Sequence, residues 1–316
     1  MARYILRRVI FMLPVALFVS FIVFILIHLV PGDPVRVLLG EEATPQTVAA
    51  LQHQLGLDKP LPQQFGLWLW QAIHGNLGTS IQLQQPVIQA FLQRIPVTLE
   101  LGLASLIYSL ALAIPLGVYS ATHRKGWLEG LINLSTLVGT AIPNFVLALL
   151  LIFLFAVAVR LFPPGGYTPF TDDPVGNVRD LVLPVIALGT STVAVNLRQL
   201  RASMVEALEQ DYVRTARAKG LSERRVTYIH ALRNSLIPLI TLVGLQIGQI
   251  LGGAVVIEVI FLWPGIGKLA IDSIFAKDYP VVQGVVLLTA FSYMLVNLLV
   301  DVSYVFLDPR IRLNKS

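Results

Sequence analysis

The stretch VTLELGLASLIYSLALAIPLGVYSA occupies residues 97–121 and carries a single charged side chain, Glu100. A helix needs about 20 apolar residues to cross the ~30 Å hydrocarbon core of a bilayer, and this stretch is long enough. Five further stretches have the same character. They cover residues 9–30, 131–158, 181–203, 236–260 and 281–307. The sequence therefore predicts an all-α membrane protein with six transmembrane helices.

The composition supports this interpretation. Of the 316 residues, 55% are hydrophobic and only 13% are charged, whereas soluble domains carry about 25% charged residues. The net charge of +5 does not indicate nucleic acid, because the basic residues lie at the ends of apolar runs, as expected of loops that orient a membrane protein. The absence of cysteine excludes disulfides and thiolate metal sites.

The distribution of Lys and Arg predicts the orientation. Arg3, Arg7 and Arg8 precede the run over 9–30, which is longer than the 7–15 apolar residues of a signal peptide, so we expect a retained first span. With the N-terminus inside, 16 of the 23 basic residues fall in cytoplasmic segments and 7 fall outside. Both termini are then cytoplasmic.

Loop lengths divide the chain into four parts. Residues 1–30 form the N-terminus and first span, 31–96 an external loop, 97–307 the transmembrane core, and 308–316 a cytoplasmic tail. The external loop is predicted to be helical, since Thr44-Pro45 is typical of a helix start. Two further short helices are expected there, over 62–74 and 86–95.

The largest cytoplasmic segment, 206–235, contains DYVRTARAKG over residues 211–220. Asp211 is a favourable N-cap and Gly220 a favourable C-terminal stop, and Ser222 begins a second helix. A helix of this length is unstable alone in water. It must therefore pack on its own chain or on a partner, and the pattern leaves both possibilities open.

Here the sequence resembles a known family. The motif at 211–220, followed by HALRNSLIP at 230–238, resembles the cytoplasmic loop of permeases from the dipeptide/oligopeptide (peptide/nickel) branch of ATP-binding-cassette importers. Further motifs of that branch occur in the expected order. They are PGDP (31–34), LGLDKP (55–60), GNLG (75–78), WPGIG (263–267), DYP (278–280), DVSY (301–304) and DPRIR (308–312).

The resemblance implies a type I, MetI-like permease fold in a bacterial inner membrane. It also implies three kinds of partner: a second related permease that completes the pore, two ATPase subunits, and an external solute-binding protein. The chain itself would hold no ATP. Importers in general carry glutamate where this chain has Arg214, and Arg-Thr-Ala at 214–216 is the form found in the peptide branch.

The same resemblance makes the segment 211–220 a coupling helix that transmits ATPase motion to the pore. It implies that Tyr212, Thr215, Ala216 and Gly220 shape the contact, and that Arg214, Arg217 and Lys219 supply charge. Asp211 and Ala218 complete the segment. Small alanine side chains would let a partner approach closely.

Candidates for the translocation path lie in two spans. Gln246 and Gln249 occupy one face of the fifth span, beside the small-residue spacing of Gly244 and Gly248; helix packing and a polar pore lining are both possible. Asn144 follows Pro143 at an expected helix break in the third span, and Glu258 lies near the external end of the fifth. The fourth span is the least apolar, because it carries Asn196, Arg198 and Arg201.

No phosphate-binding loop, metal-ligand spacing or catalytic constellation is evident in the sequence, so we expect neither enzymatic activity nor a cofactor in this chain. Two alternatives stay open. The solute could be nickel, glutathione or another small molecule instead of a di- or oligopeptide. The protein could also be an ATP-independent secondary transporter, although such carriers often show internal repeats and charges near the midplane.

Overall fold

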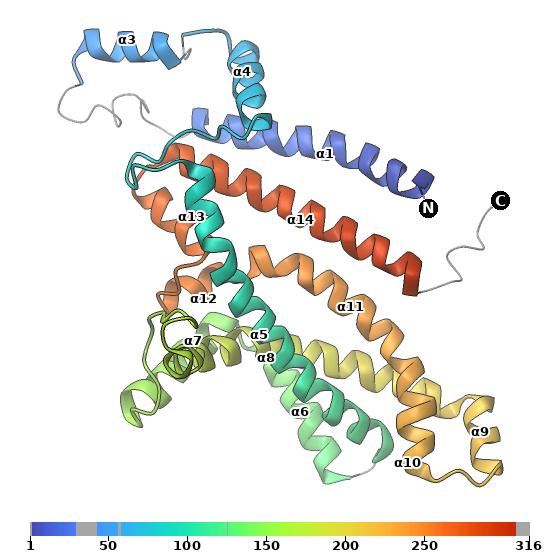
Figure 1. Ribbon diagram of the computed structural model, residues 1–316. Helices are drawn as coiled ribbons and strands as arrows, with labels where there is room; N and C mark the ends of the chain where they lie inside the picture. Colours follow the sequence, from blue (N-terminus) through green and yellow to red (C-terminus); the bar gives the residue numbers. More distant parts are fainter. Residues whose placement is uncertain (1, 30–42, 56–57, 125, 308–316) are drawn as a thin grey trace. The chain divides into compact units, whose positions relative to one another are not determined.

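The computed structural model describes residues 2–29, 43–55, 58–124 and 126–307, which are helical apart from loops and one isolated bridge between Thr79 and Pro86. The prediction of an all-α chain is confirmed for these residues (Figure 1). The motif at 31–34 and the tail at 308–316 lie outside them. The helices are α1 (Ala2–Leu29), α3 (Pro45–Leu55), α4 (Leu61–Ile73), α5 (Val87–Thr122), α6 (Trp127–Ala141), α7 (Asn144–Leu151), the π-helical η2 (Ile152–Ala158), α8 (Pro174–Glu209), α9 (Asp211–Ala218), α10 (Glu223–Arg225), the π-helical η3 (Val226–Ala231), α11 (Leu232–Gly253), α12 (Val255–Ile260), α13 (Ile266–Phe275) and α14 (Tyr279–Leu307).

Within the described residues, four helical segments are long and apolar enough to cross a membrane. They are Val87–Thr122, Pro174–Glu209, Glu223–Ile250 and Tyr279–Val300. The bent pair α6 and α7–η2 makes a fifth if it is counted as one span, and the apolar part described in α1, Ile10–Ile25, is shorter. The count of six spans therefore stays a prediction.

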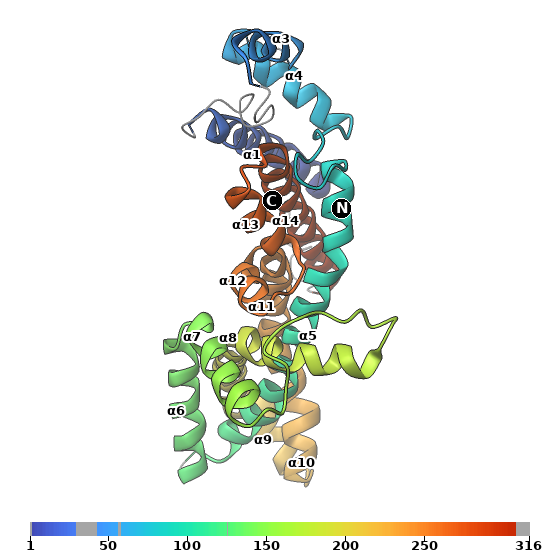
Figure 2. The same ribbon diagram turned by 90° about the vertical axis from the view of Figure 1, so that its left-hand side faces the viewer.

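The third predicted span, 131–158, is not one straight helix. α6 ends at Ala141, α7 begins at Asn144, and the two segments meet at 104° (Figure 2). Proline disfavours the α conformation in the residue before it, and Ile142 accordingly has extended backbone (φ −80°, ψ 121°). The break expected at Pro143 is confirmed, but it is sharper than a kink within a continuous span.

Two other predicted boundaries were wrong. The short helix expected over 86–95 is the first part of α5, which continues through Pro96. Phe91 and Leu101, on either side of the proline, are both buried. The fifth span was predicted as 236–260. Instead, one helical run extends from Glu223 to Gly253, and α12 follows after Ala254.

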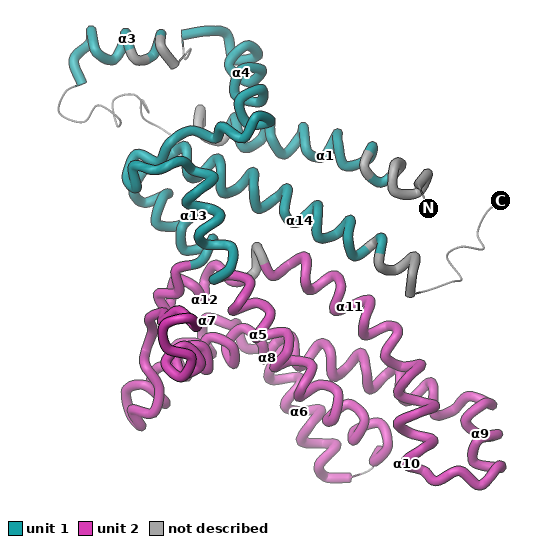
Figure 3. The backbone as a smooth tube through the Cα atoms, in the orientation of Figure 1, with its two compact units in different colours: residues 1–97, 265–302 teal, residues 98–264, 303–316 magenta. Residues whose placement is uncertain are grey.

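The chain divides into two compact units (Figure 3). Unit 1 contains residues 1–97 and 265–302. In it, Phe65 of α4 lies against Phe21 and Phe24 of α1, with ring centroids 5.6 and 5.4 Å away. The loop after α4 is fixed to the start of α14, because Ser80 Oγ donates to Asp278 Oδ2 at 2.5 Å.

Unit 2 contains residues 98–264 and 303–316, and α8 is its central helix, packed against α6, α7 and α11. A buried apolar cluster joins the ends of α5, α8 and α11 through Val118, Leu200, Met204 and Leu239. α5 and α11 approach closely at Gly102, where an added Cβ would clash with Ile250 Cγ2. This unit carries all the candidate functional residues.

Candidate coupling helix and translocation path

The candidate coupling helix is α9, an eight-residue helix between α8 and α10 (Figure 1). Its N-cap is Gln210 and not Asp211, so the predicted cap was wrong. Gln210 is extended (φ −73°, ψ 152°), and its carbonyl accepts hydrogen bonds from the backbone N–H groups of Val213 and Arg214. Asp211 therefore lies in the first turn, where its carboxylate complements the positive end of the helix dipole.

The other end of α9 forms a Schellman motif. Gly220 has φ +77°, a left-handed conformation that favours glycine. Its N–H donates to the Arg217 carbonyl at 2.9 Å, and the Leu221 N–H donates to the Ala216 carbonyl at 3.3 Å. Nothing lies within 4 Å of an added Cβ, so the backbone conformation alone explains the glycine. The prediction that Gly220 ends this helix is confirmed.

The inner face of α9 packs on its own chain. Val213 and Ala216 are buried and form an apolar cluster with Val226, against which Leu221 packs. Ala216 therefore faces its own chain, and its expected part in shaping the contact with a partner stays a prediction. The remaining predicted residues are exposed: Asp211, Tyr212, Arg214, Thr215, Arg217, Ala218, Lys219 and Gly220.

Ion pairs organise part of this exposed face. Arg217 reaches across the turn to α10 and forms a fork with Glu223, through Nε–Oε1 at 2.8 Å and Nη2–Oε2 at 3.2 Å. Arg214 Nη1 donates to Asp211 Oδ1 at 3.2 Å. Sequence reasoning missed Glu223, although an acid six residues after a basic helix end, across a glycine turn, was available as a signal.

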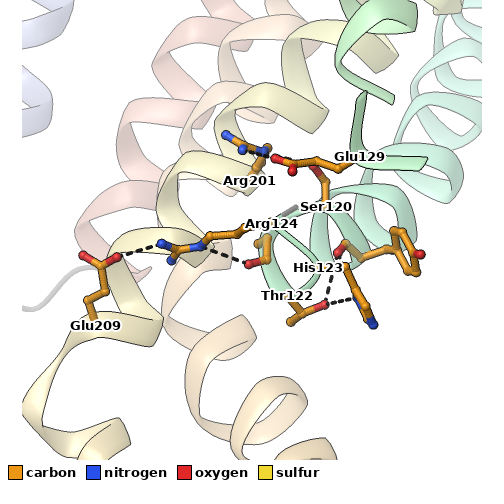
Figure 4. A network of polar contacts seen from close by, with 9 residues as sticks. Ser120, Thr122, His123, Arg124, Glu129, Arg201 and Glu209 are labelled. Carbon is orange, nitrogen blue, oxygen red and sulfur yellow. Dashed lines mark hydrogen bonds and ion pairs between the residues drawn. The ribbon is translucent and has the colours of Figure 1, made fainter. Parts of the chain in front are cut away.

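A second set of polar contacts joins the helices that lead into α9 (Figure 4). Arg201 of α8 pairs with Glu129 of α6 and donates to Ser120 Oγ of α5 at 3.0 Å. Arg124, just after α5, donates to Glu209 Oε1 at 2.9 Å. Since Glu209 is the last residue of α8, these pairs connect α5 and α6 to the segment from which α9 emerges.

An open cleft of about 820 Å³ lies beside these contacts. The end of α5, the end of α8 and the α9–α10 turn form its walls. Its charged lining residues include Arg124, Glu209, Arg217, Glu223 and Arg224. Both charge signs are present, so the cleft presents a mixed polar surface next to the candidate coupling helix.

Three of the four predicted path residues meet at a second cavity of about 210 Å³. Asn144 of α7, Gln246 and Gln249 of α11 all line it. The rest of the lining is also neutral and comes from α5, α8 and the end of α11. It comprises Gly102, Ser105, Leu106, Leu188, Ser191, Thr192, Ile250 and Ala254. The cavity thus offers amide and hydroxyl groups to whatever enters it.

The fourth predicted residue, Glu258, lies elsewhere. It is fully buried on α12 and accepts a 2.7 Å hydrogen bond from Thr98 Oγ1, and it is not among the residues that line the cavity. The break at Ala254 explains the separation, because it ends α11 before Glu258 is reached.

Another acid in the predicted spans, Glu100, is also held by its own chain. Asn177 Nδ2 donates to its Oε1 at 2.6 Å, and the Tyr167 hydroxyl donates to its Oε2 at 3.1 Å. Burial, together with the adjacent Glu100 carboxylate, raises the pKa of Tyr167 to about 12. The tyrosine therefore stays protonated and keeps donating.

Sequence reasoning missed a residue next to the cavity of about 210 Å³, whose lining includes Gln246. Asn196 of α8 is fully buried; its Nδ2 donates to Ser109 Oγ at 2.9 Å and to Gln246 Oε1 at 3.2 Å, and its Oδ1 accepts from Gln246 Nε2 at 2.8 Å. The signal was present, since a polar side chain inside a predicted span requires a partner or a function.

The comparisons with known proteins define the class. Residues 113–313 match the family described as binding-protein-dependent transport system inner membrane component, and residues 1–102 match the N-terminal part of such membrane components. The chain belongs to this family of inner-membrane transport proteins. The resemblance that its motifs indicated is confirmed.

Individual relatives agree over their full length. The dipeptide transport system permease protein DppB of Escherichia coli K12 is 40% identical over 339 residues, covering 100% of both chains. DppB of Alkalihalophilus pseudofirmus is 37% identical and covers 99% of this chain and 100% of its own. A protein of Brucella abortus strain 2308, provisionally named a peptide transport system permease, is 42% identical and covers 99% of each chain.

Proposed function

We propose that this chain forms half of the translocation pore of an ATP-driven importer of di- or oligopeptides. The observation that carries the proposal is the position of α9. Its inner face is fixed to its own chain by Val213 and Ala216, while its charged face is exposed. α9 also lies directly between α8 and the helical run from Glu223 to Gly253.

This position suits a transmitter of motion. A displacement of α9 acts on α8 through Gln210 and on the next helix through the cluster around Val226. That next helix carries Gln246 and Gln249 to the cavity of 210 Å³. A force applied at α9 is therefore passed along rigid helices to the lining of the candidate path.

The partners follow from this role. We assign the exposed face of α9 to one of two ATPase subunits, which hold ATP and Mg²⁺. A second related permease completes the pore, and an external solute-binding protein delivers the solute. In this scheme the chain has no catalytic site and no cofactor of its own.

The lining of the cavity favours peptides over nickel. It consists of amides, hydroxyls and apolar groups, whereas imidazole is a typical nickel ligand. Amides and hydroxyls are suited to hydrogen-bond peptide N–H and C=O groups. The relatives named as dipeptide and peptide permeases agree with this assignment.

We further propose that α1 is the first of six spans and that both termini are cytoplasmic. In this topology α3 and α4 belong to an external loop, and the bent pair α6–α7 is the third span. The loop charges described above support this orientation, because Lys and Arg accumulate on the cytoplasmic side.

The test is uptake by the reconstituted assembly. Proteoliposomes that contain this chain, its second permease and the ATPase subunits should accumulate a labelled dipeptide when ATP and the binding protein are present. Reversing charge at the exposed face, with Arg214→Glu and Lys219→Glu, should abolish uptake and weaken ATPase copurification, while the matched change Arg179→Glu on the first turns of α8 should not. Uptake that persists without ATP, driven by a proton gradient, would refute the proposal.

A further inference from the structure

We propose that Asn196 and Gln246 form a binding site for the peptide backbone, and that in this structure the two amides occupy each other's site. The inference rests on the proposed function, because it names how the path recognises its solute. Asn196 belongs to α8 and Gln246 to α11. Their reciprocal hydrogen bonds, 2.8 and 3.2 Å long, form a two-bond amide pair between these helices.

The chemistry of this pair matches that of a peptide group. Each side-chain amide presents one carbonyl oxygen and one NH₂ group, and an extended residue of a peptide presents its own C=O and N–H on the same side. A peptide that enters between α8 and α11 can therefore take over, bond for bond, the contacts that the two amides now make. Asn196 is held in position for this exchange by its additional bond to Ser109 Oγ.

The cost of unpaired amides favours exchange of the pair for peptide groups over separation of α8 from α11 without a solute. A buried amide left without a partner costs about 1–3 kcal/mol. Separating α8 from α11 removes both bonds of the pair and leaves the Asn196 amide with only its bond to Ser109. Asn196 is fully buried, whereas Gln246 lines the cavity. A solute that supplies backbone groups through the cavity removes the cost of opening, and a solute without them does not.

The surroundings indicate what kind of recognition results. The neighbouring polar side chains of the cavity are neutral, and they come from Ser105, Asn144, Ser191, Thr192 and Gln249. A neutral, amide-rich lining attracts neither acidic nor basic side chains in preference. The site therefore recognises the feature that all peptides share, and does not recognise their side chains.

A purely structural role for the pair is the competing explanation, and a double variant separates the two. The double leucine variant is Asn196→Leu/Gln246→Leu made together with Ser109→Ala. It removes both amides and the buried hydroxyl that Asn196 bonds, so no member of this hydrogen-bonded set is left unpaired. If the pair only holds α8 to α11, the apolar contact replaces it and uptake is retained. The matched control is the swap Asn196→Gln/Gln246→Asn, which keeps an amide on each helix at the same total volume.

The assay uses the complete assembly in proteoliposomes, with trialanine as the probe. We expect the double leucine variant to keep its thermal stability and its ATPase activity stimulated by the binding protein, but to lose about tenfold or more in uptake. The swap variant should stay within about threefold of the parent. Parental uptake by the double leucine variant would overturn the inference.

A second measurement tests the backbone contact directly. Replacing one peptide bond of trialanine by an ester removes an N–H donor, and we expect this to lower uptake by the parent protein. This loss of uptake should disappear in the double leucine variant. The binding protein's own preference for the amide over the ester is the same in both assemblies, so it does not affect the comparison between parent and variant. If that variant does not assemble, Gln246→Ala takes its place with the same expectation. An equal ester penalty in parent and variant overturns the inference alone, whereas a parent assembly that does not transport trialanine overturns the proposed function.

Discussion

The burial of the ion pair between Arg201 and Glu129 determines how much stability the protein should lose when one partner is removed. The side chain of Glu129 is 11% exposed and that of Arg201 is 32% exposed. Removing one partner of a fully buried pair costs about 3–5 kcal/mol, whereas exposed pairs contribute about 0–1 kcal/mol. Because Arg201 keeps some solvent and its bond to Ser120, we expect Glu129→Ala to destabilise the protein by about 2 kcal/mol.

The assay is thermal unfolding of the purified protein in detergent. At about 2.1 cal/mol/K of unfolding entropy per residue, a loss of about 2 kcal/mol in a chain of 316 residues corresponds to a fall of about 3 °C in the unfolding midpoint. The matched control is Glu223→Ala, which breaks the exposed pair with Arg217, whose side chains are 68% and 42% exposed. We expect that control to shift the midpoint by about 1.5 °C or less.

Both partners of the ion pair can also be replaced together. Glu129→Met/Arg201→Met replaces the pair by apolar side chains and should recover most of the lost stability, since no buried charge is then left unpaired. Equal shifts for Glu129→Ala and Glu223→Ala would refute the reasoning, because burial would then not determine the cost. A double methionine variant as unstable as Glu129→Ala would refute it as well.

Three further predictions concern other parts of the chain. Gly220→Ala should disturb the end of α9 by about 1 kcal/mol through its left-handed backbone and reduce ATPase stimulation by the binding protein, whereas Gly220→Asn, which tolerates that conformation, should reduce it less. Because the chain has no cysteine, Trp127→Cys and Val175→Cys, both exposed, can be labelled singly in intact cells; six spans predict that an impermeant maleimide reacts only at position 175. The raised pKa of Tyr167, about 12 against 10.0, adds stability that is complete below pH 10 and is lost as the pH rises toward 12, and Tyr167→Phe should remove that alkaline loss from unfolding curves.

Local signals in the sequence predicted much of this structure. The long apolar runs predicted α5, α8 and α14, and the residues around Pro143 predicted the break between α6 and α7. Gly220 predicted the end of α9, because a left-handed C-terminal residue is a local requirement of the backbone. In each case the determining interactions lie within a few residues of each other along the chain.

Features that depend on distant contacts were missed. Ala216 lies on the inner face of α9 because that face packs on Leu221 and Val226, and a helical pattern alone does not say which face meets the rest of the chain. α5 continues through Pro96 although proline lacks a backbone donor, and the residues that flank it, Phe91 and Leu101, are buried. The pair of Asn196 and Gln246 joins residues 50 positions apart, so no local pattern could identify it.

The contacts of α8 with its neighbouring helices also bear on the proposed coupling between α9 and the candidate path. α8 meets α11 at the amide pair, and it meets α6 at the pair of Arg201 with Glu129. α6 leads through Pro143 to Asn144, which lines the same cavity as Gln246. Under the proposed coupling, a displacement of α8 by α9 would act on the lining of the cavity through both of these contacts. If both routes carry motion, breaking the Arg201–Glu129 pair should lower the number of peptides imported per ATP hydrolysed, without lowering ATP hydrolysis itself, and an unchanged ratio would leave the amide pair as the single route.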